Sequence, residues 1–233
     1  MDLGFTTAAY VVAAILFILS LGGLSGQESA KRAVWYGIVG MALAVFATLI
    51  GPGSGLWFFS IILIAGGGII GYMLASRVEM TQMPELVAGM HALVGLAAVF
   101  VGFIADFEIS NVAIAKEAGT ANELTGFAAL IAKKSAIELS ILRVELFLGV
   151  FIGAITFTGS VIAYGKLSGK VTSAATKLPG GHALNAGAAI ISALCLIWYL
   201  QSGSLLPVVI MTLMAFFIGF HLIMGIGGAD MPV

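Results

Sequence analysis

Long runs of apolar residues dominate this chain of 233 residues and constrain its fold more than any other feature. A helix needs about 20 predominantly apolar residues to cross a bilayer. Seven runs reach or approach that length, at residues 4–24, 33–50, 56–75, 84–104, 137–165, 183–200 and 205–226. The sequence therefore predicts an all-α membrane protein, a polytopic transmembrane helix bundle with about seven spans.

The composition agrees with this class. The chain is 61% hydrophobic and 9% charged, against roughly 45–50% and about 25% in soluble domains. Its net charge of −1 gives no indication of a nucleic-acid partner. The first apolar run has no basic residue before it and continues to about Leu24. We interpret it as a retained span and not as a signal peptide.

Charged residues separate the fourth run from the fifth. No uncharged stretch in 105–136 is long enough to span, so we expect an external loop there with one or two short surface helices, one of them near 124–131. Basic residues in the loops predict an N-terminus outside and a C-terminus in the cytoplasm. One side has six of them and the other has three, namely Lys31, Arg32, Arg77, Lys166, Lys170 and Lys177 against Lys116, Lys133 and Lys134.

His91 is the most informative polar residue. Between Met83 and Ile104 only Glu85 and His91 are ionisable. His91 lies seven residues after Pro84, or about 10 Å into the helix. A titratable ring at that depth indicates a functional site, and histidine changes charge near neutral pH. We interpret His91 as part of a proton path; the alternative is a structural hydrogen bond to a neighbouring helix.

The fifth run adds further candidates for a proton path. Glu145 lies about 12 Å below the start of that run. It is either an outer proton station or a member of an interhelical pair; Arg143, two residues away, faces another direction on a helix. Ser160, in the sequence TFTGS, is a candidate for a hydrated path, although hydroxyls also bond back to helix carbonyls.

Other motifs are less specific. His182 opens the sixth run and is either a coupling residue or an ordinary loop residue, while His221 near the end of the last run either anchors the interface or carries protons. The glycines at 66–71 match G-x-G-x-x-G without a preceding strand, so we interpret them as helix packing. Gly149 and Gly153 form a small-xxx-small pair. The histidines and carboxylates show no metal-ligand spacing.

Four long stretches are specific in sequence: AAYVVAAILFILSLGGLS, VEMTQMPELVAGMHALVGLAAV, VELFLGVFIGAITFTGSVIAYGKLSGK and GGADMPV. Together they resemble the N-terminal membrane domain of the beta subunit of the proton-translocating NAD(P) transhydrogenase. The resemblance runs from about Thr7 to the last residue, apart from 105–137. It implies His91, Glu145 and Ser160 in the proton path, and His182 and Asp230 in coupling to the nucleotide domains.

The family couples hydride transfer from NADH to NADP⁺ to inward proton movement. The resemblance therefore implies an alpha subunit that binds NAD(H), a C-terminal domain that binds NADP(H), and a dimer of alpha–beta units. It implies that this chain itself binds no cofactor and lacks the family's last two spans and its NADP-binding domain. The implied location is the inner (plasma) membrane, or the mitochondrial inner membrane in a eukaryote.

Two other interpretations compete with this one. A stand-alone secondary transporter with His91 as its proton-coupling site would commonly show an inverted repeat, and we find no convincing internal repeat. A structural membrane anchor without a proton role would not need ionisable residues inside its spans, as His91 and Glu145 are here.

Overall fold

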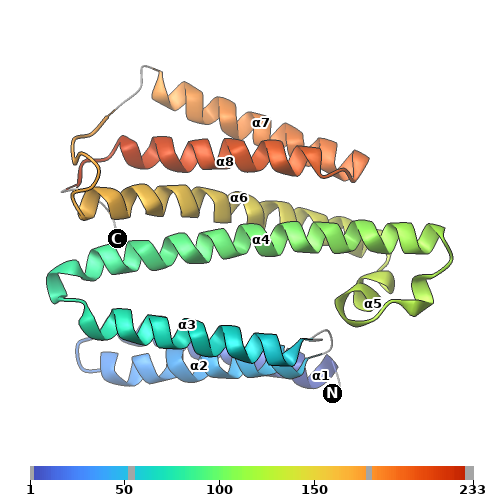
Figure 1. Cartoon of the computed structure of the whole chain (residues 1–233), viewed down its shortest axis with the longest axis horizontal. Coiled ribbons are helices and arrows are strands. Elements are labelled where there is room, and N and C mark those ends of the chain that lie inside the picture. Colours follow the sequence, from blue (N-terminus) through green and yellow to red (C-terminus); the bar gives the residue numbers. More distant parts are fainter. Residues whose placement is uncertain (1–2, 52–55, 177–179, 229–233) are drawn as a thin grey trace. The chain divides into compact units, whose positions relative to one another are not determined.

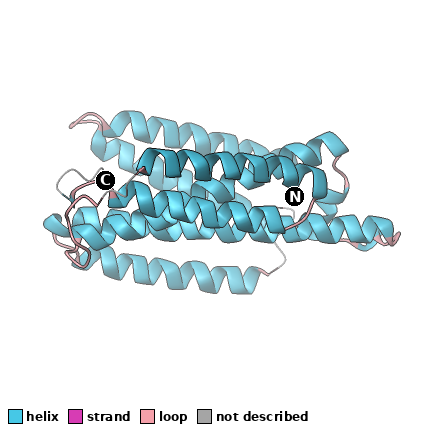
Figure 2. Cartoon of the chain, turned by 90° about the horizontal axis from the view of Figure 1, so that it is seen from above, coloured by secondary structure: helices cyan, strands magenta, loops and turns pink. Residues whose placement is uncertain are grey.

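The computed structural model describes residues 3–51, 56–176 and 180–228, and within these ranges the chain is helical without strands (Figures 1 and 2). Seven of the helices are long and apolar enough to cross a membrane. They are α1 (Leu3–Leu24), α2 (Ala30–Ile50), α3 (Trp57–Arg77), α4 (Met83–Glu117), α6 (Ala136–Leu167), α7 (Gly181–Ser202) and α8 (Leu206–Met224). The predicted fold class is confirmed, because each predicted apolar run corresponds to one of these helices, with ends that differ by at most two residues at 56–75 and 205–226.

The segment 105–136 differs from the expected loop. Helix α4 does not end near Ile104 but continues to Glu117, and only then do a 3-10 turn (Ala121–Glu123) and the short helix α5 (Gly126–Ala132) follow. The buried positions explain the continuation, since they keep a helical spacing of three or four residues through Gly102, Asp106, Ile109 and Val112. The charge-based boundary was wrong because a helix can extend past its apolar run. The placement of this segment outside the membrane stays a prediction.

The chain divides into two compact units, residues 1–70 with 122–130, and residues 71–121 with 131–233. In the first unit α1 packs along α2 through small buried residues such as Ala13, Ala33 and Gly40. A hydrogen bond of 2.9 Å between the Tyr10 and Thr48 hydroxyls adds a polar link. Small residues let two helix backbones approach closely in lipid, where apolar burial alone gives little drive for association.

The second unit is an antiparallel bundle in which α4 packs along α6, α6 along α8, and α8 along α7 (Figure 1). Glycines set the closest approach of α4 and α6. A Cβ at Gly95 would lie 2.7 Å from the Gly153 carbonyl oxygen, and one at Gly153 would lie 2.8 Å from the Gly95 carbonyl oxygen. Gly219 permits a similar crossing of α8 on α6, beside Ile155 and Thr158. At Gly149, the predicted partner of Gly153 in packing, an added Cβ would meet no atom within 4 Å.

The bundle has two ends with different residues. The start of α4, the end of α6, the start of α7 and the end of α8 lie at one end, which we call the α8 end (Figure 1). Ala88 and Ala163 pack there with Tyr164, Leu167 and Ile223. The opposite end holds the α7–α8 turn, with Gly203 in a left-handed conformation. Antiparallel connections thus bring residues far apart in sequence to the same end.

Candidate functional site

His91 lies on α4 beside the face that contacts α6, and its ring is exposed on the second unit. Its Nδ1 is 2.8 Å from the carbonyl oxygen of Val87, one turn earlier on the same helix. The neighbouring Ala92 and Gly95 are buried. The ring is therefore anchored to its own helix, which leaves Nε2 for another partner.

Ser160 lies on α6 at the level of His91. Antiparallel packing places Gly89 of α4 next to Tyr164 of α6, and Gly95 next to Phe157. His91 and Ser160 each lie between these two contacts, and Ser160 is half-buried. The structure thus brings two of the predicted path residues to one level of the α4–α6 pair.

Glu145 lies far from this level. It is exposed on α6, fifteen residues before Ser160, which corresponds to about 22 Å along the helix. Arg143 faces another direction, with its guanidinium carbon 5.8 Å from the centre of the Tyr199 ring. The geometry agrees with separate environments for Glu145 and Arg143.

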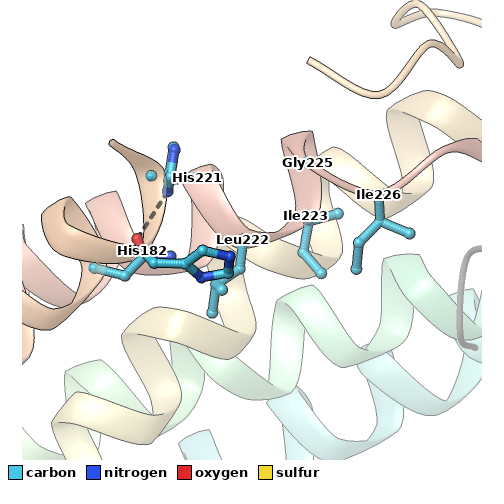
Figure 3. Close-up of a pocket in the computed structure, with 8 residues that line it drawn as sticks. His182, His221, Leu222, Ile223, Gly225 and Ile226 are labelled. Atoms are coloured by element: carbon cyan, nitrogen blue, oxygen red, sulfur yellow. Dashed lines mark hydrogen bonds between the residues drawn. The ribbon is translucent and has the colours of Figure 1, made fainter. Parts of the chain in front are cut away.

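A cavity of about 540 Å³ lies at the α8 end, between the start of α7 and the end of α8 (Figure 3). His182 is exposed and His221 is buried, and both line it together with Asn185. The Nδ1 of His221 is 2.8 Å from the amide oxygen of Asn185. His182 therefore shares a largely apolar cavity with a second histidine, between α7 and α8.

Lys166 caps the C-terminal end of α8. The side chain is 2% exposed, and its Nζ donates to the carbonyl oxygens of Ile223, Met224 and Ile226 at 3.2, 3.0 and 2.7 Å. The last carbonyls of a helix have no partner within the helix, and an ammonium supplies three donors. Sequence reasoning placed Lys166 in a loop and counted it only for orientation, so this contact was missed.

A second polar group at the opposite end was also missed. Buried Asp106 of α4 accepts a hydrogen bond from the buried hydroxyl of Tyr199 in α7. The ring of Tyr199 stacks on Phe147, at 6.0 Å between centroids. Helical spacing from Gly95, Gly102 and Asp106 was the available signal for this position. This signal was not used, because residues 105–136 were expected to form a loop.

The remaining predictions concern coupling and bound groups. Asp230 lies outside the described residues. Among the described residues, no group of three His, Cys, Asp or Glu side chains is arranged to hold a metal ion. The G-x-G-x-x-G match at 66–71 lies inside α3, so it lacks the strand–turn–helix context of a dinucleotide site.

The comparisons with known proteins agree on one family. The family model described as NAD(P) transhydrogenase beta subunit matches residues 6–233. Two similar proteins, from Rhodospirillum rubrum and from a named strain of the same species, are each described as NAD(P) transhydrogenase subunit beta. Each is 41% identical over 230 residues, which cover 98% of this chain and 45% of the relative. The chain thus spans just under half the length of these relatives.

A match over nearly the whole chain, together with seven long apolar helices, fixes the class of this protein. The chain belongs to the NAD(P) transhydrogenase beta subunit family, of which it forms a multi-pass membrane portion.

Proposed function

We propose that this chain is the proton-conducting membrane part of an NAD(P) transhydrogenase. In this proposal it couples inward proton translocation to hydride transfer from NADH to NADP⁺, which other domains carry out. An alpha subunit holds NAD(H), and a domain that follows the membrane portion of the beta subunit holds NADP(H). Two alpha–beta units form the working dimer in the inner (plasma) membrane, or in the mitochondrial inner membrane of a eukaryote.

The observation that carries the proposal is the shared level of His91 and Ser160 on the α4–α6 pair. Both lie within helices long enough to span a bilayer, where ionisable and polar side chains commonly mark ion pathways. His91 is fixed through Nδ1 to Val87, so Nε2 is the nitrogen that exchanges a proton. Glu145 serves the outer half of the path and His91 the inner half.

The complete enzyme in sealed lipid vesicles provides the test. A proton gradient directed across the membrane in the inward sense should accelerate reduction of NADP⁺ by NADH, and a protonophore should remove the acceleration. A rate that does not respond to the gradient, in vesicles shown to hold it, contradicts the proposal.

Asp230 is assigned to coupling within the same proposal. In the sequence it follows α8 and the pair Gly227 and Gly228. Replacing Asp230 with Asn should alter the release of NADP(H) more than the passive proton permeability of the vesicles. Stopped-flow nucleotide release and a pH-sensitive dye measure the two quantities. Unchanged nucleotide kinetics remove Asp230 from this role.

A further inference from the structure

His221 has the features of a functional histidine although the path through His91 does not use it. Its side chain is 7% exposed, on the last turn of α8. Its ring stacks on Phe217, with 5.6 Å between ring centroids and 5° between the ring planes. A buried histidine that stacks on an aromatic ring can adopt few orientations. What it can bind is then decided by the surroundings of its two ring nitrogens.

The two nitrogens of His221 have different surroundings. The amide oxygen of Asn185 faces Nδ1 at 2.8 Å, so Nδ1 carries a hydrogen and donates it. In the neutral ring Nε2 is then an acceptor. Figure 3 shows this second nitrogen directed away from Asn185. Gly181 leaves room for this edge of the ring, because a Cβ there would lie 2.9 Å from Cε1 and 3.3 Å from Nε2.

The cavity beside this ring is large enough to hold water. Its volume of about 540 Å³ exceeds by far the space that a single water molecule needs. Its lining combines His182, Asn185 and His221 with apolar side chains of α8. A ring at this position can exchange a proton with water while the rest of its surface stays packed.

We propose that His221 is a proton-binding residue of the α7–α8 side of the bundle, with Asn185 as its positioning residue. This inference rests on the proposed function and deepens it. Nε2 takes a proton from water in the cavity, which turns the neutral ring into an imidazolium, and later returns it to water. The bond from Nδ1 to Asn185 persists in both forms, because the amide oxygen only accepts.

Charged and polar groups face His221 from α6 and from α7. From α6, Lys166 places its Nζ on the carbonyls that follow His221, and from α7, His182 lines the same cavity. The end of α8 favours a cation, whereas the start of α7 and the Lys166 ammonium disfavour one. Protonation of His221 thus changes the electrostatics of the carbonyls that Lys166 holds. These carbonyls immediately precede the segment toward Asp230.

The test uses the complete enzyme in vesicles and two variants. His221→Asn keeps a polar side chain but cannot take up the proton, and Asn185→Leu removes the acceptor at Nδ1. Proton translocation should fall on the order of tenfold or more with His221→Asn, and the pH profile of coupled turnover should change with both. Phe220→Leu is the matched control, because Phe220 is exposed on the same turn of α8; it should behave as the unmodified enzyme does.

A second measurement does not depend on the stability of a variant. Nitrogen NMR of labelled histidine in the complete enzyme should show His221 with hydrogen on Nδ1, and gaining one on Nε2 across the pH range in which the enzyme pumps. A ring that keeps one protonation state over that range overturns the inference. So does a His221→Asn enzyme with unaltered pumping and pH profile.

A parallel His91→Asn enzyme separates this inference from the proposed function. If His91→Asn blocks pumping and His221→Asn does not, the inference about His221 fails and the proposed function stands. If neither replacement affects pumping, the proposed proton path fails as well.

Discussion

At the scale of single residues, many polar side chains of the spans bond to carbonyl oxygens of their own helix. Thr156 donates to Ile152 at 2.8 Å, and Thr212 donates to Val208 at 2.7 Å. Such bonds satisfy a hydroxyl in an apolar surrounding at little cost. The hydroxyl of Thr156 thus has its partner within α6. Lys166 and His221 differ, because their hydrogen bonds connect one helix to another.

The first prediction concerns Lys166. Replacing it with Met keeps the apolar stem and removes the donors to three carbonyls at the end of α8. Buried acceptors left without partners cost about 1–3 kcal/mol, so the complete enzyme in detergent should unfold at a lower temperature. Lys170→Met is the control, since Lys170 is exposed and its Nζ bonds to the Tyr164 hydroxyl at 3.1 Å. Equal unfolding temperatures for the two variants contradict the role given to Lys166.

The second prediction concerns Glu145. In the proposed path Glu145 is the outer station and exchanges protons, whereas Gln has the same shape and cannot. Glu145→Gln should therefore shift or abolish the pH dependence of proton-coupled turnover, while hydride exchange that is not coupled to protons survives. Turnover measured over a range of pH in sealed and in leaky vesicles separates these rates. An unchanged pH profile makes Glu145 a structural residue.

At the scale of elements, apolar run length predicted all seven long helices, because the bilayer fixes the length of a spanning segment. It did not predict where they end. The end of α4 was not predicted, because charged residues such as Glu108 and Lys116 suggested that the helix had already ended. The helix continues past them because Ile109 and Val112 stay buried on its packed face. Side-chain pairing was missed for a similar reason. The bond between Asp106 and Tyr199 joins residues 93 positions apart, and no local pattern encodes it.

The third prediction compares two glycines of α6. A Cβ at Gly153 would lie 2.8 Å from the Gly95 carbonyl oxygen and 2.9 Å from the Cβ of Ala98, whereas one at Gly149 meets no atom within 4 Å. Gly153→Ala should destabilise the α4–α6 pair by about 1–3 kcal/mol through overpacking.

Gly149→Ala is the matched variant on the same helix. It should leave stability unchanged or raise it by up to about 1 kcal/mol, the helix preference of Ala over Gly. Thermal unfolding of both variants in the complete enzyme measures the difference. A destabilisation of Gly149→Ala as large as that of Gly153→Ala would show that the crossing at Gly95 is not the close contact.

At the scale of the whole molecule, the candidate site was predictable in part. The depth of His91 in an apolar run and the resemblance to a family motif made it a candidate without a structure. That His91 lies at the level of Ser160 could not be predicted without the register of α4 against α6, which Gly95 and Gly153 set. The cavity that His182 and His221 line could not be predicted either. It forms because α8 runs antiparallel beside α7 and brings together Asn185 and His221, which are 36 residues apart in sequence. Tertiary contacts of this kind cannot be predicted from the pattern of a single segment.

The central claim is that protons pass by His91 on their way through this bundle. The most direct test is the ratio of protons moved to hydrides transferred by the complete enzyme in sealed vesicles, with His91 replaced by Asn. An amide keeps a polar side chain at this exposed site and removes the titratable ring. The account predicts normal insertion and assembly with loss of proton movement. Proton movement at the unmodified ratio would contradict it.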